Sequence, residues 1–102
     1  MSTLQIRLEQ KALEKTAYVL KCVAHPVRIS IIDLLTQRDR LTVSQLQRVL
    51  QIEQSLLSHH LTNMRDKGLV DTQREGKNVF YSLTDSTITD IISCIQSCKL
   101  FS

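Results

Sequence analysis

The chain has 102 residues, of which 42% are hydrophobic and only 4% are aromatic, with no Trp. This length supports one compact domain with a small core, spanning residues 1–102, and excludes two domains. The net charge of +3 is mildly basic, which suits a polyanionic partner but is far weaker than the charge of a polybasic nucleic-acid tail.

The expected cellular compartment rests on two features that the sequence does not show, a membrane span and a signal peptide. No apolar run approaches the roughly 18 residues of a membrane span, and the first ten residues carry Arg7 and Glu9 where a signal peptide needs an apolar stretch. We therefore expect a cytoplasmic protein with no membrane partner. Because the cysteine count of three is odd, a disulfide framework is not expected.

Two helices are predicted in the first third of the chain. Apolar residues recur at helical spacing from Thr3 to Cys22, which indicates an amphipathic helix. That helix should end soon afterwards, because Pro26 disfavours helical backbone angles at His25. Pro26 suits the first turn of a second helix, with His25 at its N-cap, and the apolar pattern carries this helix to about Thr36.

Two further helices are separated by a short turn. Thr42 and Gln45 form the pattern of a capping box, in which each side chain satisfies a backbone N–H, and this pair opens a short third helix. Residues 51–53 interrupt the helical spacing. A fourth helix is predicted from Gln54 to Lys67, ending before Gly68, which suits a left-handed C-terminal cap.

The last third of the chain predicts a hairpin and a fifth helix. Residues 69–74 and 78–83 are extended by composition, and residues 75–77 between them suit a hairpin turn. Four isoleucines then recur on one face of a helix that should run to the C-terminus: Ile88, Ile91, Ile92 and Ile95. This order of elements predicts a mainly helical domain with a small β-hairpin wing, the winged helix-turn-helix plan.

The fourth helix carries a face of neutral polar side chains. The residues not needed for packing are Gln54, Ser55, Ser58, His59, Thr62 and Asn63. Their donors and acceptors can pair with base edges or phosphates, and the free N–H groups at the start of the helix suit a phosphate oxygen. Each residue alone could simply be solvated, but a solvated face usually carries Lys and Glu, which are better helix formers. The face as a whole predicts a DNA-reading helix.

Three segments resemble the ArsR/SmtB family of bacterial metal- and stress-responsive repressors: LKCVAHPVRISIIDLL, QSLLSHHLTNMRDKGLV and REGKNVFYSLT. The likeness spans about residues 20–84. By this resemblance four residues of the fourth helix face DNA: Gln54, Ser55, Ser58 and His59. Arg74 and Lys77 match the basic wing that touches the DNA backbone or the minor groove.

The resemblance also implies a homodimer formed by the first and last helices, which agrees with the apolar stripes at both ends of the chain. Such a dimer would place its recognition helices about 34 Å apart and read an inverted repeat in a double-stranded operator. We expect a transcriptional repressor whose occupancy of the operator blocks transcription. The sequence also fits an alternative function, in which the winged-helix domain binds a partner protein instead of DNA.

The effector patterns of that family are mostly unmatched. The helix leading into the turn lacks the cysteine pair of the arsenic-type site. In the zinc pattern of the terminal helix only Asp85 matches, while Thr87, Cys98 and Phe101 occupy the other positions. The sulfide-sensing pattern has Asp33 where it needs a cysteine.

Cys94 and Cys98 nevertheless lie one helical turn apart, with Cys22 near the end of the first helix. Two thiolates at this spacing, with Cys22 as a third, can bind arsenite or a soft metal, or can cycle through a disulfide. The alternative is that these cysteines are small hydrophobes, since Cys98 falls beside Ile91 and Ile95. A soft metal or metalloid ion at the thiolates is the only candidate cofactor, and the metal remains undetermined.

The three histidines are not spaced as a chelate. His59 belongs to the polar face of the fourth helix, whereas His60 is expected to pack inward or at the edge of the core. No Gly-rich phosphate loop, activated nucleophile or carboxylate pair is legible in the sequence. An enzyme is therefore not expected.

Overall fold

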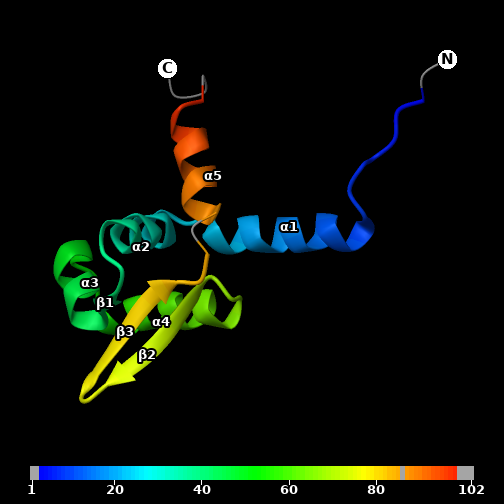
Figure 1. The fold of residues 1–102 in the computed structure, drawn as a ribbon. Helices are drawn as coiled ribbons and strands as arrows, with labels where there is room; N and C mark the ends of the chain where they lie inside the picture. Colours follow the sequence, from blue (N-terminus) through cyan, green and yellow to red (C-terminus); the bar gives the residue numbers. More distant parts are fainter. Residues whose placement is uncertain (1–2, 86, 99–102) are drawn as a thin grey trace.

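A computed structural model describes residues 3–85 and 87–98. Within them the chain forms five helices and three strands (Figure 1): α1 (Gln10–Val23), α2 (Pro26–Gln37), β1 (Leu41–Thr42), α3 (Val43–Leu50), α4 (Gln54–Asp66), β2 (Val70–Glu75), β3 (Asn78–Leu83) and α5 (Thr87–Gln96). This architecture confirms the predicted winged helix-turn-helix plan.

The core lies between α2, α3, α4 and the base of the sheet. Its fully buried side chains include Ile31 and Ile32 of α2, Leu46 of α3, and Leu57, Leu61 and Met64 of α4. The α4 residues are the inward stripe that helical spacing predicts. Because these three side chains fix one face of α4 against the core, the opposite face of α4 must point outward.

The predicted helix starts at Pro26 and after Thr42 are confirmed. His25 caps α2 by accepting a hydrogen bond at Nδ1 from the backbone N–H of Val27 (3.2 Å). In the capping box of α3, Thr42 Oγ1 accepts from the Gln45 N–H (3.2 Å), and Gln45 Oε1 accepts from the Thr42 N–H (2.8 Å). These bonds satisfy amide groups that the helices leave without internal partners.

The sheet contains one strand that the sequence did not predict. β1 pairs antiparallel with β3 in the order β1-β3-β2, with Leu41 opposite Tyr81. The sequence predicted no strand between the second and third helices, because a strand of two residues has no periodicity and is formed only by pairing with its partner. The wing turn is also shorter than predicted, since Glu75 pairs with Asn78 and leaves only residues 76–77 between the strands. Gly76 turns the chain there with φ +61°.

The predicted start of the first helix is wrong. α1 begins at Gln10, and residues 3–9 are not helical; Leu4 is 97% exposed. Most of the stability of a helix comes from packing of its apolar face, and within one chain this segment leads away from the body and has no surface to pack against (Figure 1). The apolar pattern of residues 3–9 therefore does not form the helix that its spacing predicts.

Both predicted C-terminal boundaries shift slightly. α4 ends at Asp66 with Lys67 as its cap, followed by Gly68 at φ +79°. α5 ends at Gln96, and Phe101 lies outside the described residues.

Among the described helices, none is both long and apolar enough to cross a bilayer.

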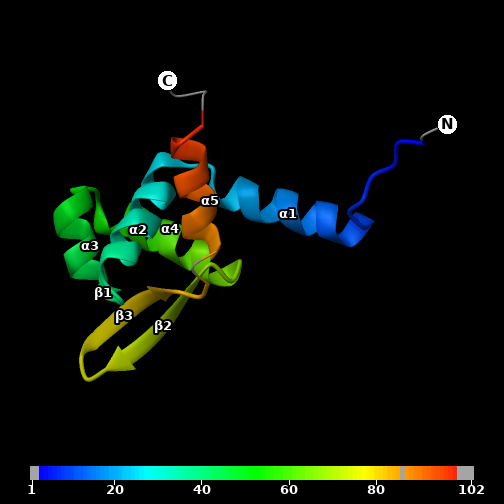
Figure 2. The ribbon, with the colours of Figure 1, turned by 45° about the horizontal axis from the view of Figure 1, so that its top comes forward.

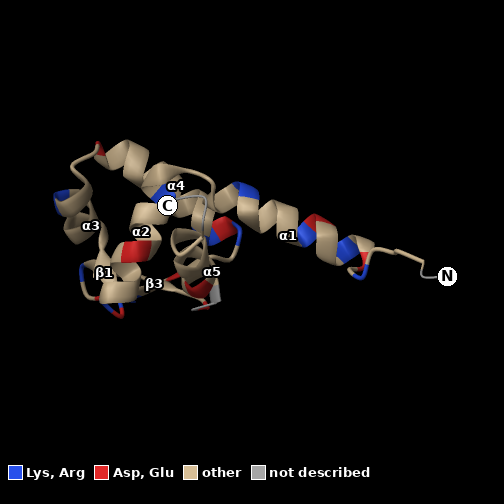
Figure 3. Ribbon diagram, turned by 90° about the horizontal axis from the view of Figure 1, so that it is seen from above, with Lys and Arg blue, Asp and Glu red and all other residues tan. Residues whose placement is uncertain are grey.

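α1 and α5 meet near the C-terminal end of α1, and the two helices run in different directions (Figures 1 and 2). The first part of α1 projects from the body, and its acidic and basic residues are interspersed (Figure 3). The expected packing of the first and last helices is thus limited to this junction within one chain.

Candidate nucleic-acid interface

The turn between α3 and α4 sets the direction of the recognition helix. Gln51 adopts the left-handed conformation (φ 53°, ψ 48°), and its N–H donates to the Gln47 carbonyl (2.7 Å). The side-chain amide of Gln47 then donates to the Ile52 carbonyl (3.2 Å). These contacts close the turn over three residues, so that α4 starts at a fixed angle to α3.

The structure brings the predicted α4 residues together on its outer face. Gln54, Ser55, His59 and Thr62 are exposed, and Ser58 is half-buried. They share one side because the helix repeats about every 3.6 residues. From Gln54 to Met64 the helix carries no Lys, Arg, Asp or Glu, and the N-terminal half of α4 is uncharged in Figure 3. The outer face therefore offers neutral hydrogen-bonding groups.

Asn63 does not belong to that outer face, so its assignment from sequence is wrong. It is half-buried, and its Oδ1 accepts from Arg28 Nη1 (2.7 Å) and from the Cys22 thiol (3.6 Å). The inward orientation predicted for His60 is confirmed, since it is only 4% exposed and its Nδ1 accepts from Arg28 Nε (2.9 Å). Burial, and then the nearby charge of Arg28, lower the pKa of His60 below its ordinary value.

The wing presents Arg74 and Lys77 to solvent. Arg74 lies on β2, and Lys77 follows Gly76 in the turn. Glu75 between them pairs with Arg40 at 2.7 Å, and this contact lowers the pKa of the Glu75 carboxyl. The acidic residue at the wing tip is therefore neutralised by Arg40, while the two predicted basic residues remain available.

Sequence reasoning missed Leu56, which is 45% exposed on α4. An apolar residue is usually assigned to the core, but Leu56 and Leu57 are adjacent, and successive helix positions point about 100° apart. Since Leu57 is fully buried, that spacing was the available signal that Leu56 turns outward. An apolar side chain at this place can contact a thymine methyl group.

The three cysteines do not form one site. Cys22 is buried, 3% exposed, at the contact with Asn63, whereas Cys94 and Cys98 are exposed. Among the described residues, no three His, Cys, Asp or Glu side chains are placed to hold a metal ion. Cys98 lies beyond the end of α5, where its N–H donates to the Ile95 carbonyl (3.1 Å). The structure does not bring Cys22 together with Cys94 and Cys98 as a third ligand, and Cys98 is not buried within a single chain.

Comparison with known proteins identifies the family. A family model described as bacterial regulatory protein, arsR family, matches residues 25–72. The chain is 32% identical over 88 residues to the HTH-type transcriptional regulator YgaV of Escherichia coli K12, covering 86% of this chain and 89% of that protein. It is 34% identical over 90 residues to the transcriptional repressor PagR of Bacillus anthracis, covering 88% and 90%. The chain belongs to the ArsR family.

Solved structures of similar proteins have the same fold. HlyU from Vibrio cholerae superposes with a TM-score of 0.78 at 32% identity, covering 87% of this chain and 96% of that one. The transcriptional repressor BigR from Xylella fastidiosa gives 0.79 at 29% identity, covering 91% and 92%. This ArsR-family protein is a DNA-binding transcriptional regulator and not an enzyme, as the sequence predicted.

Proposed function

We propose that this ArsR-family protein is a homodimeric repressor that reads an inverted repeat, with α4 in the major groove of each half-site. The observation that carries the proposal is the uncharged polar face of α4, which lies opposite the buried Leu57, Leu61 and Met64. The similar protein PagR is named a transcriptional repressor, which supports repression, rather than activation, as the effect of operator binding.

The proposed contacts divide by chemistry. The polar side chains of α4 form hydrogen bonds with base edges and nearby phosphates: Gln54, Ser55, Ser58, His59 and Thr62. Leu56 adds an apolar contact at the margin of this face. The N–H groups at the start of α4 suit a phosphate oxygen. Arg74 and Lys77 reach the DNA backbone or the minor groove from the wing.

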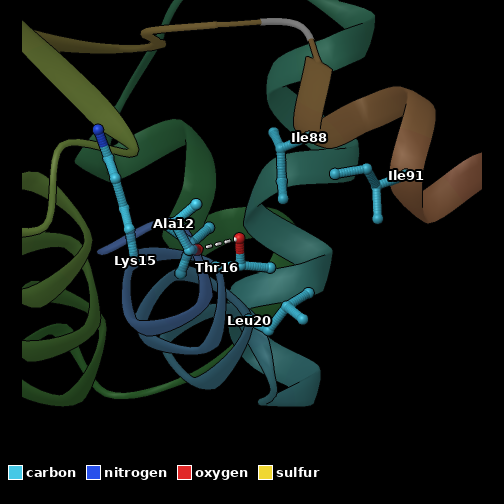
Figure 4. Close-up of a pocket in the computed structure, with 7 residues that line it drawn as sticks. Ala12, Lys15, Thr16, Leu20, Ile88 and Ile91 are labelled. Carbon is cyan, nitrogen blue, oxygen red and sulfur yellow. Dashed lines mark hydrogen bonds between the residues drawn. The ribbon is translucent and has the colours of Figure 1, made fainter. Parts of the chain in front are cut away.

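The dimer is proposed because α1 and α5 leave an apolar surface uncovered. Cavities of about 350 and 440 Å³ lie between these helices, and Leu20, Ile88 and Ile91 line both. Figure 4 shows side chains of both helices around the first cavity, where Thr16 Oγ1 donates to the Ala12 carbonyl (2.7 Å). A contiguous apolar patch is typical of an interaction surface, and a second copy of the chain covers it symmetrically.

Selection of bound DNA from a random pool, followed by salt titration, tests DNA reading. Ser58→Ala and His59→Ala should lower operator affinity and leave the thermal midpoint nearly unchanged. Lys77→Ala should weaken binding to all sequences and lower the salt slope by about one. If Gln54, Ser55, Ser58 and His59 can all become alanine without loss of operator binding, α4 is not the reader.

We also propose Cys94 and Cys98 as a thiol site that releases DNA. Both thiols are exposed, and two thiolates suit a soft ion whose remaining ligands come from solvent. Alternatively, peroxide can take two electrons and two protons from the pair, forming a disulfide and two waters. Replacing both by serine should abolish the response of the operator complex to arsenite, cadmium, zinc, persulfide or peroxide. Equal responses in both proteins would reject this site.

A further inference from the structure

A polar cluster behind the recognition helix is centred on one arginine. Arg28 of α2 is half-buried and donates from Nε to His60 Nδ1 (2.9 Å) and from Nη1 to Asn63 Oδ1 (2.7 Å). The same Nη1 also donates to the Cys22 carbonyl near the end of α1 (3.0 Å). One side chain therefore connects α1, α2 and α4.

The two α4 residues of this cluster are neighbours of proposed DNA readers. His60 follows His59 and Asn63 follows Thr62, and the two cluster residues lie one helical turn apart on α4. Because each helix position is fixed relative to the next, the contacts that hold His60 and Asn63 also fix the directions of His59 and Thr62. A small rotation of α4 about its axis would move every reader relative to the bases.

We infer that Arg28 is a positioning residue for operator recognition, which fixes the rotation of α4 through its hydrogen bonds to His60 and Asn63. This inference rests on the proposed reading of DNA by α4. The buried apolar stripe of Leu57, Leu61 and Met64 supplies adhesion to the core, but apolar contacts are not directional. The orientation of α4 is set by the hydrogen bonds of Arg28, because its planar guanidinium donates in fixed directions to two acceptors.

The cluster requires a neutral His60. Its Nδ1 accepts from Arg28, so the ring proton is on Nε2, which is buried and has no hydrogen-bond partner in the described part of the chain. A proton on Nδ1 would face the Arg28 donor and break the contact. The pKa of His60 is lowered by burial and by the charges of Arg28, His25 and His59. The His25 and His59 ring centroids lie 4.5 and 6.1 Å from that of His60. The Cys22 thiol of α1 accepts from Arg28 Nη1 (3.5 Å), and Lys67 at the end of α4 interacts electrostatically with Arg28.

Three variants separate positioning from other roles of Arg28. Arg28→Lys keeps the positive charge but replaces the planar guanidinium, which donates to two acceptors in fixed directions, by a single ammonium group. His60→Leu keeps apolar volume and removes the acceptor, whereas its matched control His60→Asn places an amide oxygen near the position of Nδ1. For each variant, affinity for the operator and for random-sequence DNA is measured against salt, together with the thermal midpoint.

The expected result is a loss of discrimination. Arg28→Lys and His60→Leu should lower the ratio of operator to random-sequence affinity roughly tenfold, the effect of one lost charge-assisted hydrogen bond. Affinity for random-sequence DNA and the salt slope should not change. His60→Asn should retain the ratio. In the wild type the ratio should also fall as the pH drops through the lowered pKa of His60, while His60→Asn should show no such fall.

Other results would overturn the inference. Equal losses for both DNAs with a salt slope lower by about one would make Arg28 a phosphate contact. A lower thermal midpoint with an unchanged ratio would make it a structural residue only. If Arg28→Lys does not fold, the pair His60→Asn and His60→Leu decides, and equal ratios in that pair reject the inference. Failure of the proposed function is distinct, because the wild type itself would then show no operator preference.

Discussion

Arg40 and Glu75 join the loop before β1 to the tip of the wing through two parallel hydrogen bonds. Nη1 donates to Oε1 (2.7 Å) and Nη2 to Oε2 (2.9 Å), and the Arg40 guanidinium lies 4.0 Å from the centroid of the Phe80 ring. A two-point contact of this kind fixes orientation as well as distance. The wing is therefore held against the body at its tip as well as at its base.

Replacing Arg40 by alanine should loosen the wing without unfolding the domain. Both partners are exposed, so the ion pair contributes little to global stability. Amide hydrogen exchange should become faster at Asn78, whose pairing with Glu75 closes the wing, and stay unchanged in α4. Unchanged exchange in the wing would show that the pair does not hold it.

The same ion pair predicts the sign of a small pH effect. The pKa of Glu75 in the folded protein is below its ordinary value near 4.5, so the pair stabilises the fold above that value. This contribution is lost as the pH falls through the lowered pKa. The acid dependence of the thermal midpoint should therefore be weaker in Glu75→Gln than in the wild type, and an identical dependence would contradict the prediction.

Leu56 and Leu57 should respond oppositely to the same substitution. Leu57 is fully buried, so Leu57→Ala should lower the free energy of unfolding by about 2–5 kcal/mol. Leu56→Ala should barely change stability, because its side chain is half in solvent, but it should weaken operator binding. Chemical denaturation and operator titration of both variants check this, and a stable Leu57→Ala protein would contradict the described core.

Gln51 is a non-glycine residue in the left-handed region, at φ 53°. Because a side chain in that region costs about 1–2 kcal/mol, Gln51→Gly should raise the free energy of unfolding, offset in part by the greater flexibility of glycine in the unfolded chain. Gln51→Val should lower it. Urea denaturation measures both, and a destabilised glycine variant would mean that the Gln51 side chain makes a contact worth more than the strain.

Disrupting the proposed dimer should abolish operator binding. Ile91 and Ile95 are 40% and 47% exposed on α5, and Ile91→Glu should give a monomer because it places a charge in the apolar contact. Ser93→Glu, also exposed on α5, is the matched control. Sedimentation at micromolar concentration distinguishes these outcomes. A monomeric wild type with full operator affinity would rule out the arrangement.

Local chemistry explains which elements were predictable. The cap of α2 at His25, the box at Thr42 and the glycine after α4 each depend on groups within a few residues, and all three were found. The start of α1 and the strand β1 depend on what the segment packs against, which residue spacing does not contain. Contact across the fold, rather than propensity, decides such elements.

The candidate site divides in the same way. The outward face of α4 follows from helical spacing, so four of the six predicted residues are exposed, whereas Ser58 and Asn63 are half-buried. Asn63 was misplaced because its partner Arg28 is 35 residues away in the sequence. The local sequence does not show whether a polar side chain accepts a hydrogen bond from a residue far away in the chain. The sequence therefore did not predict the cluster behind α4 either.

The projecting α1 has a hydrodynamic consequence. The molecule measures 64 × 33 × 22 Å, with a radius of gyration of 16.3 Å, whereas a compact domain of this length has about 13 Å. An elongated particle diffuses more slowly than a sphere of equal mass, so a single chain should elute from a sizing column as though it were heavier. Light scattering at the same elution volume, which reports mass independently of shape, is the appropriate way to count subunits.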